Sequence, residues 1–303
     1  MRVTLTGATG LIGPRLVREL LSRGDEVTVL TRDPAKARAA LDGVEAVAWA
    51  DPGSEPAPAE ALAGRDAVVH LAGEPVAQRW SDDVKRRILA SREHGTRNLV
   101  AGLRASDPRP AALVSSSAVG YYGHHDDERL DEQTPPGSDF LAGVCAAWER
   151  EAQAAAEDGT RVVVVRTGIV LDADGGALET MLPFFKLGIG GPVAGGRQYM
   201  PWIHLDDLVG IYLQAVDDPS WSGPVNGSAP EPVTNKAFSK ALGKVLKRPA
   251  FAPVPTLAIK ALYGEMAQIV VNGQRAVPAR TTELGYEFRH AELEAALHSA
   301  LDR

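Results

Sequence analysis

A glycine-rich segment near the start of the chain has the residue types and spacing that bind a phosphate group. Residues 6–13 read Thr-Gly-Ala-Thr-Gly-Leu-Ile-Gly and lie between a strand-like run and an amphipathic helical pattern. In such a loop, one glycine permits the tight turn, one lets the backbone approach a pyrophosphate, and one lets the helix pack closely on the strand. The N–H groups of the first helical turn then face the negative charge. We expect a dinucleotide site here, the alternative being a tight turn without a ligand. The expected contacts come from Gly7, Thr9, Gly10, Leu11, Ile12 and Gly13.

The end of the second strand-like run, residues 26–31, indicates which nicotinamide dinucleotide is bound. An acidic residue at this place hydrogen-bonds the ribose hydroxyls, whereas an arginine accommodates a 2′-phosphate. Here Thr31 and Arg32 come first and Asp33 follows. We therefore expect Thr31 and Arg32 to contact the cofactor, and NADP(H) to be preferred over NAD(H). The alternative is an exposed Arg32 with Asp33 directed into the site.

Alternating strand-like and helical patterns must position these residues. Short apolar runs that alternate with helical periods are typical of a parallel sheet covered on both faces. The strand-like runs are residues 2–6, 26–31, 44–49, 66–71, 111–115 and 161–166. Helical patterns occupy residues 11–23, 82–105 and 140–157. We predict an α/β fold with a doubly wound, Rossmann-type parallel sheet.

The second half of the chain has a different residue pattern. Paired glycines after Thr167 divide it into loops and short segments before helical patterns return. Those patterns occupy residues 207–216, 235–246, 258–271 and 291–301. We expect an NADP-binding Rossmann domain over residues 1–170, with its sheet completed by later segments at about 200–230. A smaller C-terminal α/β substrate lobe with a helical extension is expected over residues 171–303.

Composition excludes several functional classes. The 303 residues hold 32 Lys and Arg against 39 Asp and Glu, a net charge of -7, which argues against nucleic-acid binding. The single cysteine, Cys145, excludes an internal disulfide and a Cys-based zinc site. No run approaches the ~18 consecutive apolar residues of a membrane-spanning helix. The strand-like run at residues 2–6 begins without the apolar core and cleavage site of a signal peptide. We expect a cytoplasmic protein that binds a small-molecule substrate, with no nucleic acid and no membrane as partner.

Three more segments, taken with the glycine-rich loop, resemble the extended short-chain dehydrogenase/reductase superfamily, and specifically its epimerase/dehydratase branch. They are residues 70–73 (His-Leu-Ala-Gly), 115–123 (Ser-Ser-Ser-Ala-Val-Gly-Tyr-Tyr-Gly) and 201–207 (Pro-Trp-Ile-His-Leu-Asp-Asp). The resemblance spans nearly the whole chain. It implies that the cofactor lies beside Leu71, Ala72 and Gly73, and that Ser117 holds the place of the catalytic serine.

A narrower resemblance is to an "epimerase family" subgroup with a C-terminal domain of unknown function. Residues 88–92, 187–192 and 264–288 carry it. It favours Arg92 as a partner of a cofactor phosphate, the alternative being a solvated or salt-bridged arginine. Because extended members often form dimers, a monomer or a homodimer is expected.

The chain departs from the superfamily in its acid/base residues. The resemblance calls for a tyrosine followed four residues later by a lysine, yet none of the 6 tyrosines has such a lysine. The corresponding helix has Phe140 or Leu141 at the tyrosine position and Val144 or Cys145 at the lysine position. These apolar side chains do not exchange protons at neutral pH.

Ser117, Tyr121 and Tyr122 are the candidates for the missing proton transfer. For Ser117 the alternative is a strand-end hydroxyl bonded to local backbone, and for the tyrosines it is aromatic packing over the nicotinamide. His204 titrates near neutrality and is either an acid/base group or a structural hydrogen-bonding residue.

We expect no metal. The run at residues 124–128 places two histidines beside three acids, but neighbouring residues on a flexible loop rarely share one ion. Asp206 and Asp207 are expected to cap the helix that follows them.

Two functions agree with these features. One is an NADP(H)-binding oxidoreductase or epimerase-like enzyme for a small carbonyl or nucleotide-sugar-like substrate, in which the cofactor carries the hydride chemistry. The other is a non-catalytic NADP(H)-binding sensor or scaffold, which the absent Tyr–Lys pair favours.

Overall fold

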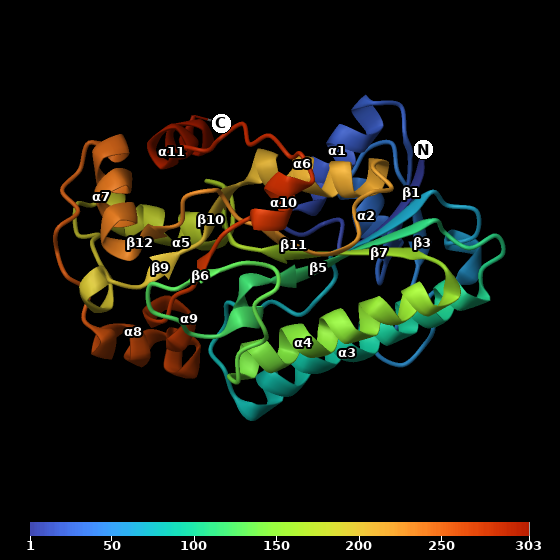
Figure 1. Cartoon of the computed structure of the whole chain (residues 1–303), viewed down its shortest axis with the longest axis horizontal. Coiled ribbons are helices and arrows are strands. Elements are labelled where there is room, and N and C mark those ends of the chain that lie inside the picture. The colour runs from blue at the N-terminus through green and yellow to red at the C-terminus, as the bar shows by residue number, and fades with distance from the viewer. Residues whose placement is uncertain (303) are drawn as a thin grey trace.

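A parallel sheet of seven strands, six from residues 2–167 and one from residues 223–227, forms the centre of the larger part of the computed structural model, which describes residues 1–302 (Figure 1). All of its pairings are parallel, so the expected α/β doubly wound, Rossmann-type sheet is confirmed. In spatial order the strands are β11 (Gly223–Gly227), β7 (Arg161–Thr167), β5 (Ala112–Ala118), β4 (Ala67–His70), β1 (Arg2–Thr6), β2 (Glu26–Thr31) and β3 (Glu45–Ala48).

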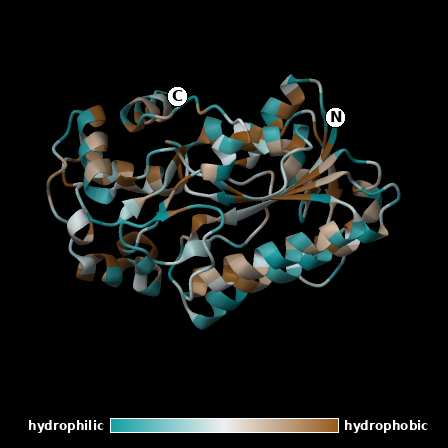
Figure 2. Ribbon diagram, in the orientation of Figure 1, coloured by the Kyte–Doolittle hydropathy of each residue, from teal (hydrophilic) through white to brown (hydrophobic). Residues whose placement is uncertain are grey.

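Helices cover both faces of this sheet. One face carries α1 (Gly13–Ser22), α2 (Pro34–Ala40) and α6 (Leu205–Asp217). The other carries α3 (Asp82–Ala105) and α4 (Phe140–Gln153), which run along the lower side in Figure 1. Successive strand residues face opposite sides, so Val68 packs with the α3 side and Val69 with the α1 side. Both faces are therefore apolar, as the brown central strands in Figure 2 show.

The C-terminal half adds short strands and helices beside the carboxyl end of the sheet. Its strands are β8 (Ile169–Leu171), β9 (Tyr199–Met200), β10 (Trp202–His204), β12 (Val233–Thr234) and β13 (Arg275–Ala276), the last paired with β6 (Arg129–Leu130). Its helices are α5 (Gly176–Lys186), α7 (Asn235–Leu246), α8 (Thr256–Tyr263), α9 (Ala267–Val271), α10 (Ala279–Glu283) and α11 (Leu293–Leu301).

Two features of this half differ from the sequence patterns. The single helix expected over residues 258–271 is divided between α8 and α9 at Gly264, whose φ of +62° is left-handed. Helix α5 forms where glycine-rich loops were expected. Its residues Leu178, Leu182 and Phe185 recur at helical spacing and are buried in the same apolar cluster as Trp202. Tertiary burial therefore outweighs the flanking glycines.

Among residues 1–302, no helix is both long and apolar enough to cross a membrane.

His70, at the carboxyl end of β4, is buried as a neutral ring. Its Nδ1 lies 2.7 Å from the Thr6 hydroxyl and its Nε2 lies 3.0 Å from the Thr96 hydroxyl. Burial, and then the nearby charge of Arg92, lower the pKa of His70 to about 4. As the pH falls, His70 in the unfolded chain is therefore protonated near its ordinary pKa of about 6.5, whereas His70 in the folded protein is protonated only near pH 4.

Acid is consequently expected to destabilise the fold through His70. The stability is complete above about pH 6.5 and is lost as pH falls towards 4, by about 2–3 kcal/mol. The variant His70→Gln keeps the hydrogen-bonding capacity but does not titrate, so this part of the loss should disappear. Urea unfolding of both proteins at pH 7 and pH 4.5 measures the difference. Equal losses in the two proteins would show that His70 does not carry the effect.

Candidate functional site

The carboxyl ends of four neighbouring strands bring the expected cofactor residues to one edge of the sheet. Residues 7–13 follow β1, Thr31 ends β2 with Arg32 directly after it, residues 71–73 follow β4, and Ser117 lies near the end of β5. The spatial order of these strands is β2, β1, β4, β5. In open parallel sheets, ligands bind at this edge, where the strand order reverses.

The loop after β1, residues 7–13, has glycines where no side chain fits, and we call it the glycine cradle. Gly7 has a left-handed φ of +68°, and a Cβ there would lie 2.7 Å from the backbone of Leu71 and Ala72. A Cβ on Gly13 would lie 2.2 Å from the carbonyl oxygen of Ala8. No side chain caps α1 at Ile12, so the N–H groups of its first turn are left for a ligand. These features fit a pyrophosphate.

After β2, the carboxylate of Asp33 is bonded to α2 and is directed away from its neighbour Arg32. The Asp33 carboxylate accepts a hydrogen bond of 3.0 Å from the Lys36 N–H and thereby caps α2. The Asp33 N–H in turn donates to the Thr31 hydroxyl over 3.2 Å. Arg32 itself is exposed. The carboxylate is thus directed to the helix, which leaves the guanidinium for a 2′-phosphate.

Ser117 belongs to a buried polar network that sequence reasoning missed. Its hydroxyl donates to Glu149 Oε1 over 2.6 Å. Arg166 holds the same carboxylate at both oxygens, from Nε over 2.9 Å and from Nη2 over 2.8 Å. The side chains of Arg166 and Glu149 are only 4% and 14% exposed. Burial alone would lower the pKa of Arg166, but Glu149 raises it above its ordinary value, so Arg166 stays charged.

The two tyrosines lie on the other side of Arg166, in the short helical turn Val119–Tyr122. The Tyr122 hydroxyl donates to Asn226 Oδ1 over 2.7 Å and accepts from Arg166, and burial raises its pKa far above the usual range. The Tyr121 ring stacks on the guanidinium with 3.5 Å between Arg166 Cζ and the ring centroid. Burial raises the pKa of Tyr121 too, although Arg166 opposes the shift. Neither phenol is therefore activated as an acid.

The helix positions that resemble those of the tyrosine and lysine hold apolar side chains, although the Lys85 ammonium lies 5.6 Å from the centroid of the Phe140 ring. Phe140 packs edge-on against Trp80 with 5.2 Å between ring centroids. Val144 lies in the same cluster as Met266, which comes from the C-terminal extension. Burial raises the pKa of the Cys145 thiol to about 11, so this side chain is neutral. The C-terminal extension therefore packs against the place where the proton relay is missing.

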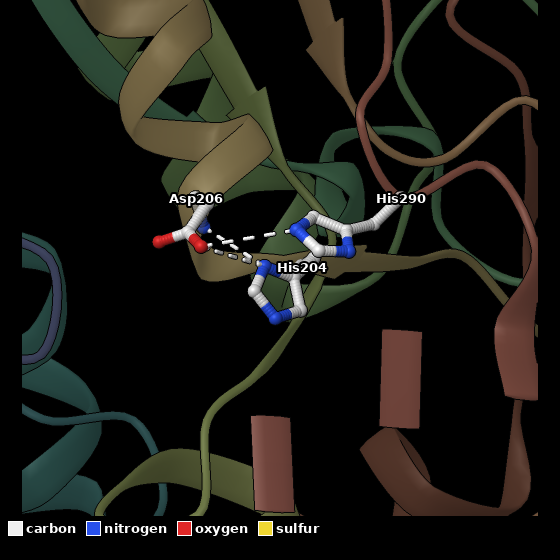
Figure 3. Close-up of side chains that lie close together, drawn as sticks. All are labelled: His204, Asp206 and His290. Carbon is white, nitrogen blue, oxygen red and sulfur yellow. Dashed lines mark hydrogen bonds and ion pairs between the residues drawn. The ribbon is translucent and has the colours of Figure 1, made fainter. Parts of the chain in front are cut away.

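His204, Asp206 and His290 gather beside the start of α6 (Figure 3). The Asp206 N–H donates to His204 Nδ1 over 3.1 Å, so His204 caps α6. One nitrogen or oxygen atom of each residue lies within 4.8 Å of the others. However, the two rings stack with 3.8 Å between centroids and 29° between planes, so their in-plane nitrogen lone pairs do not converge on one ion. Arg15 also pairs with Asp206 over 3.0 Å.

Asp207 fastens the C-terminal segment to α6. Its carboxylate accepts from the Tyr286 hydroxyl and from the N–H groups of Arg289 and His290, over 3.2, 2.8 and 2.9 Å. The expectation that Asp206 and Asp207 cap the helix is thus corrected, because the cap is His204. The capping position was missed because histidine is an uncommon N-cap residue.

Comparison with known proteins agrees with this architecture. A model of the NAD dependent epimerase/dehydratase family matches residues 3–226, and a Domain of unknown function (DUF1731) matches residues 254–300. The Arabidopsis thaliana "Epimerase family protein SDR39U1 homolog, chloroplastic" is 42% identical over 311 residues, covering 99% of this chain and 87% of the relative. The Homo sapiens "Epimerase family protein SDR39U1" is 37% identical over 302 residues and covers 98% of both chains.

Solved structures show the same likeness. The crystal structure of human epimerase family protein SDR39U1 with NADPH has a TM-score of 0.89 and 36% identity, and it covers 100% of both chains. Thermus thermophilus UDP-glucose 4-epimerase with NAD has a TM-score of 0.76 at 21% identity, covers 99% of this chain and 98% of its own, and shares the fold alone. The chain therefore belongs to the NAD-dependent epimerase/dehydratase family of short-chain dehydrogenase/reductases, as an SDR39U1-type member with a C-terminal domain of unknown function.

Proposed function

We propose that this chain is an NADP(H)-dependent oxidoreductase or epimerase-like enzyme that acts on a small carbonyl or nucleotide-sugar-like substrate. The observation that carries the proposal is the arrangement at the carboxyl ends of the strands. The glycine cradle of residues 7–13 follows β1, and Ser117, hydrogen-bonded to Glu149, lies near the end of β5 in the same sheet. The NADPH in the human relative's structure supports the choice of cofactor. We propose residues 1–170 as the cofactor domain and residues 171–303 as the substrate lobe.

The chain's own residues divide the work as follows. The nicotinamide supplies or accepts a hydride when it is bound. Ser117 passes a proton from solvent water to the substrate oxygen when a carbonyl is reduced, and returns one to water when an alcohol is oxidised, for which its Oγ must approach the substrate oxygen within about 2.6–3.2 Å. Glu149 accepts from Ser117 and orients the hydroxyl, while Arg166 holds the Glu149 carboxylate in place. Tyr121 covers Arg166, and Tyr122 supports it from within the core.

A non-catalytic NADP(H) sensor or scaffold is the second candidate. The apolar contacts of Phe140 and the neutral thiol of Cys145, at the positions that resemble the proton relay, favour it. In either case we propose a monomer or homodimer that works in the cytoplasm on a small molecule, without a resident metal.

Arg32 is expected to make the site prefer NADPH over NADH. Losing its charge-assisted contact with the 2′-phosphate should cost about 1.5–3 kcal/mol, or roughly 10- to 100-fold in affinity. We expect Arg32→Ala to weaken NADPH binding by this factor and to leave NADH binding almost unchanged. Titration of both proteins with both dinucleotides measures it. Equal affinities of the native protein for NADPH and NADH would rule out the preference.

A further inference from the structure

Arg275 places a positive charge within the C-terminal half of the chain, on the short strand β13. Its guanidinium lies over the ring of Tyr199 in β9, with 5.0 Å between Arg275 Cζ and the ring centroid. On another side, Nη1 donates to the backbone carbonyl of Asp127 over 3.3 Å. Gly273 lets the chain approach β9 closely, because an added Cβ there would lie 2.6 Å from the Tyr199 backbone. The guanidinium is therefore held in place from two sides.

The other donors of this guanidinium have no partner in the described chain. Within residues 1–302, Arg275 Nε is buried without a hydrogen bond, and Nη2 makes none. No carboxylate oxygen of these residues lies within 4.0 Å of its nitrogens. The acids that precede β6 contact histidines instead. Glu128 lies 3.0 Å from His125, and Asp126 lies 4.0 Å from His124. The protein thus orients the charge of Arg275 without neutralising it.

A second arginine lies beside the first. Arg129 of β6 is the register partner of Arg275 in β13. The next pair in register, Leu130 and Ala276, is fully buried. Because successive strand residues face opposite sides, Arg129 and Arg275 share the other face. Arg129 is exposed and has no ion pair within residues 1–302. Like charges opposite each other destabilise a strand pair, and an anion bound between them would offset this cost.

Arg197 adds a third positive charge on the side of Tyr199. Burial alternates over this segment, because Gln198 and Met200 are buried whereas Arg197 is exposed and Tyr199 is partly exposed. Arg197 and Tyr199 therefore project from the same side. Arg197 too has no carboxylate within 4.0 Å among the residues that the structure describes. We call Arg129, Arg197 and Arg275 the arginine cluster.

The arginine cluster lies near the network of Ser117. From Arg129 the chain continues to Glu132, whose carbonyl oxygen accepts from Arg166 Nη1 over 3.1 Å. Three residues span at most about 11 Å. Arg166 holds the Glu149 carboxylate to which Ser117 donates. The serine hydroxyl and the arginine cluster are thus separated by about the length of a small extended molecule.

We propose that Arg275, with Arg129 and Arg197 beside it, binds an anionic group of the substrate, a phosphate monoester or a carboxylate. A guanidinium presents a planar fork of N–H donors that matches the oxygen atoms of either group. The inference rests on the proposed function, because it takes the anion as part of the substrate. It narrows the substrate class from small carbonyl compounds in general to anionic ones, and it makes Arg275 the residue that selects them.

Equilibrium dialysis with radiolabelled inorganic phosphate and acetate tests the site without any turnover. The protein is first saturated with NADP⁺, so that the glycine cradle and Arg32 take up no phosphate. We expect Arg275→Gln to weaken binding of the preferred anion at least about 10-fold, and Arg129→Gln about threefold. The ratio of phosphate to acetate affinity shows which anionic group the site prefers.

Arg109→Gln is the matched control and should change neither affinity. Arg109 Nη1 also donates to the backbone carbonyl of an aspartate, Asp158, over 3.3 Å, but Arg109 precedes β5 at the opposite end of the sheet. Arg129→Gln changes an exposed side chain, so it keeps the test valid if Arg275→Gln does not fold. Unchanged affinity for both anions in folded Arg275→Gln, or in Arg129→Gln, would overturn the assignment.

Turnover of matched compounds shows whether the anion belongs to the substrate. Ribose 5-phosphate is compared with ribose, and 6-oxohexanoate with hexanal, by following NADPH absorbance. We expect the native protein to prefer the anionic member of at least one pair. Arg275→Gln should lower kcat/KM for that member about 10- to 100-fold, chiefly by raising KM, and change the neutral member less than about twofold.

The outcomes separate this inference from the proposed function. Equal losses for the anionic and the neutral member would mean that Arg275 has a structural role, and would overturn the inference. Turnover of neutral and anionic members at equal kcat/KM in the native protein would also overturn it, and would leave the proposed function standing. Anion binding that depends on Arg275, without turnover of any compound, would leave the anion site and contradict the proposed enzyme.

Discussion

Gly13→Val is expected to abolish NADPH binding, with a loss of at least about 100-fold in affinity. The added Cβ would lie 2.2 Å from the Ala8 carbonyl oxygen, which belongs to backbone and has no flexible side chain to displace. The loop must therefore shift away from α1, and the N–H groups that face the pyrophosphate shift with it. Fluorescence titration with NADPH measures the affinity, and circular dichroism checks the fold.

Two other glycines serve as controls for this prediction. Gly10→Val should also lose NADPH but keep more stability, because its Cβ meets only the Gly7 oxygen, at 3.3 Å. Gly95→Ala lies in α3 with nothing within 4 Å of its Cβ, so affinity should not change. Alanine at this helical position should stabilise the fold by up to about 1 kcal/mol. Unchanged NADPH affinity in folded Gly13→Val would mean that the loop does not bind the cofactor.

Ser117→Ala is expected to lower turnover by about 100-fold or more, while NADPH affinity stays the same. The variant removes the hydroxyl that exchanges the proton but leaves the Arg166–Glu149 pair intact. Phe140→Tyr should raise turnover by much less, because no lysine lies four residues later to lower the new phenol's pKa. NADPH absorbance, followed over a panel of small aldehydes, ketones and dicarbonyls, provides the assay.

The outcome of this screen separates the two candidate functions. Undiminished turnover in Ser117→Ala would remove Ser117 from the mechanism. Absence of turnover on the whole panel, together with tight NADPH binding, would favour the sensor. Glu149→Gln adds a check on the network, since it keeps the hydrogen-bond acceptor for Ser117 but removes the charge that Arg166 holds.

The sheet and the glycine-rich loop after its first strand could be predicted from sequence because both depend on local patterns. Short continuous apolar runs, helical stripes and the glycines of residues 6–13 are each recognisable within about ten residues. The place of Arg32 directly after β2 was predictable in the same way, and its contact with a cofactor stays a prediction. These are short-range signals that the fold preserves.

The polar network around Ser117 could not be predicted, because it depends on how α4 is rotated against β5 and β7. Glu149 lies 32 residues from Ser117 and 17 from Arg166, and helical periodicity does not determine which side chains meet across that interface. One signal was available: Arg166 directly follows four buried valines in β7, and a charge at such a position needs a partner.

The His204–His290 stack was missed for the same reason, since a segment 86 residues later in the chain provides the second ring. Sequence patterns also failed where burial decides the structure. Helix α5 forms beside paired glycines because its apolar stripe fits against Trp202. Arg92 shows the opposite case, because its charge looks solvated in the sequence and only packing against Gly73 and Trp148 reveals its burial.

A crystal structure of the protein with NADP⁺ bound tests the central claim most directly. We predict the 2′-phosphate at Arg32, the pyrophosphate at the first turn of α1, and the nicotinamide half between Arg92 and Ser117. A dinucleotide bound in the opposite direction, with its adenosine half over β4 and β5, would contradict the account. So would one bound away from this edge of the sheet.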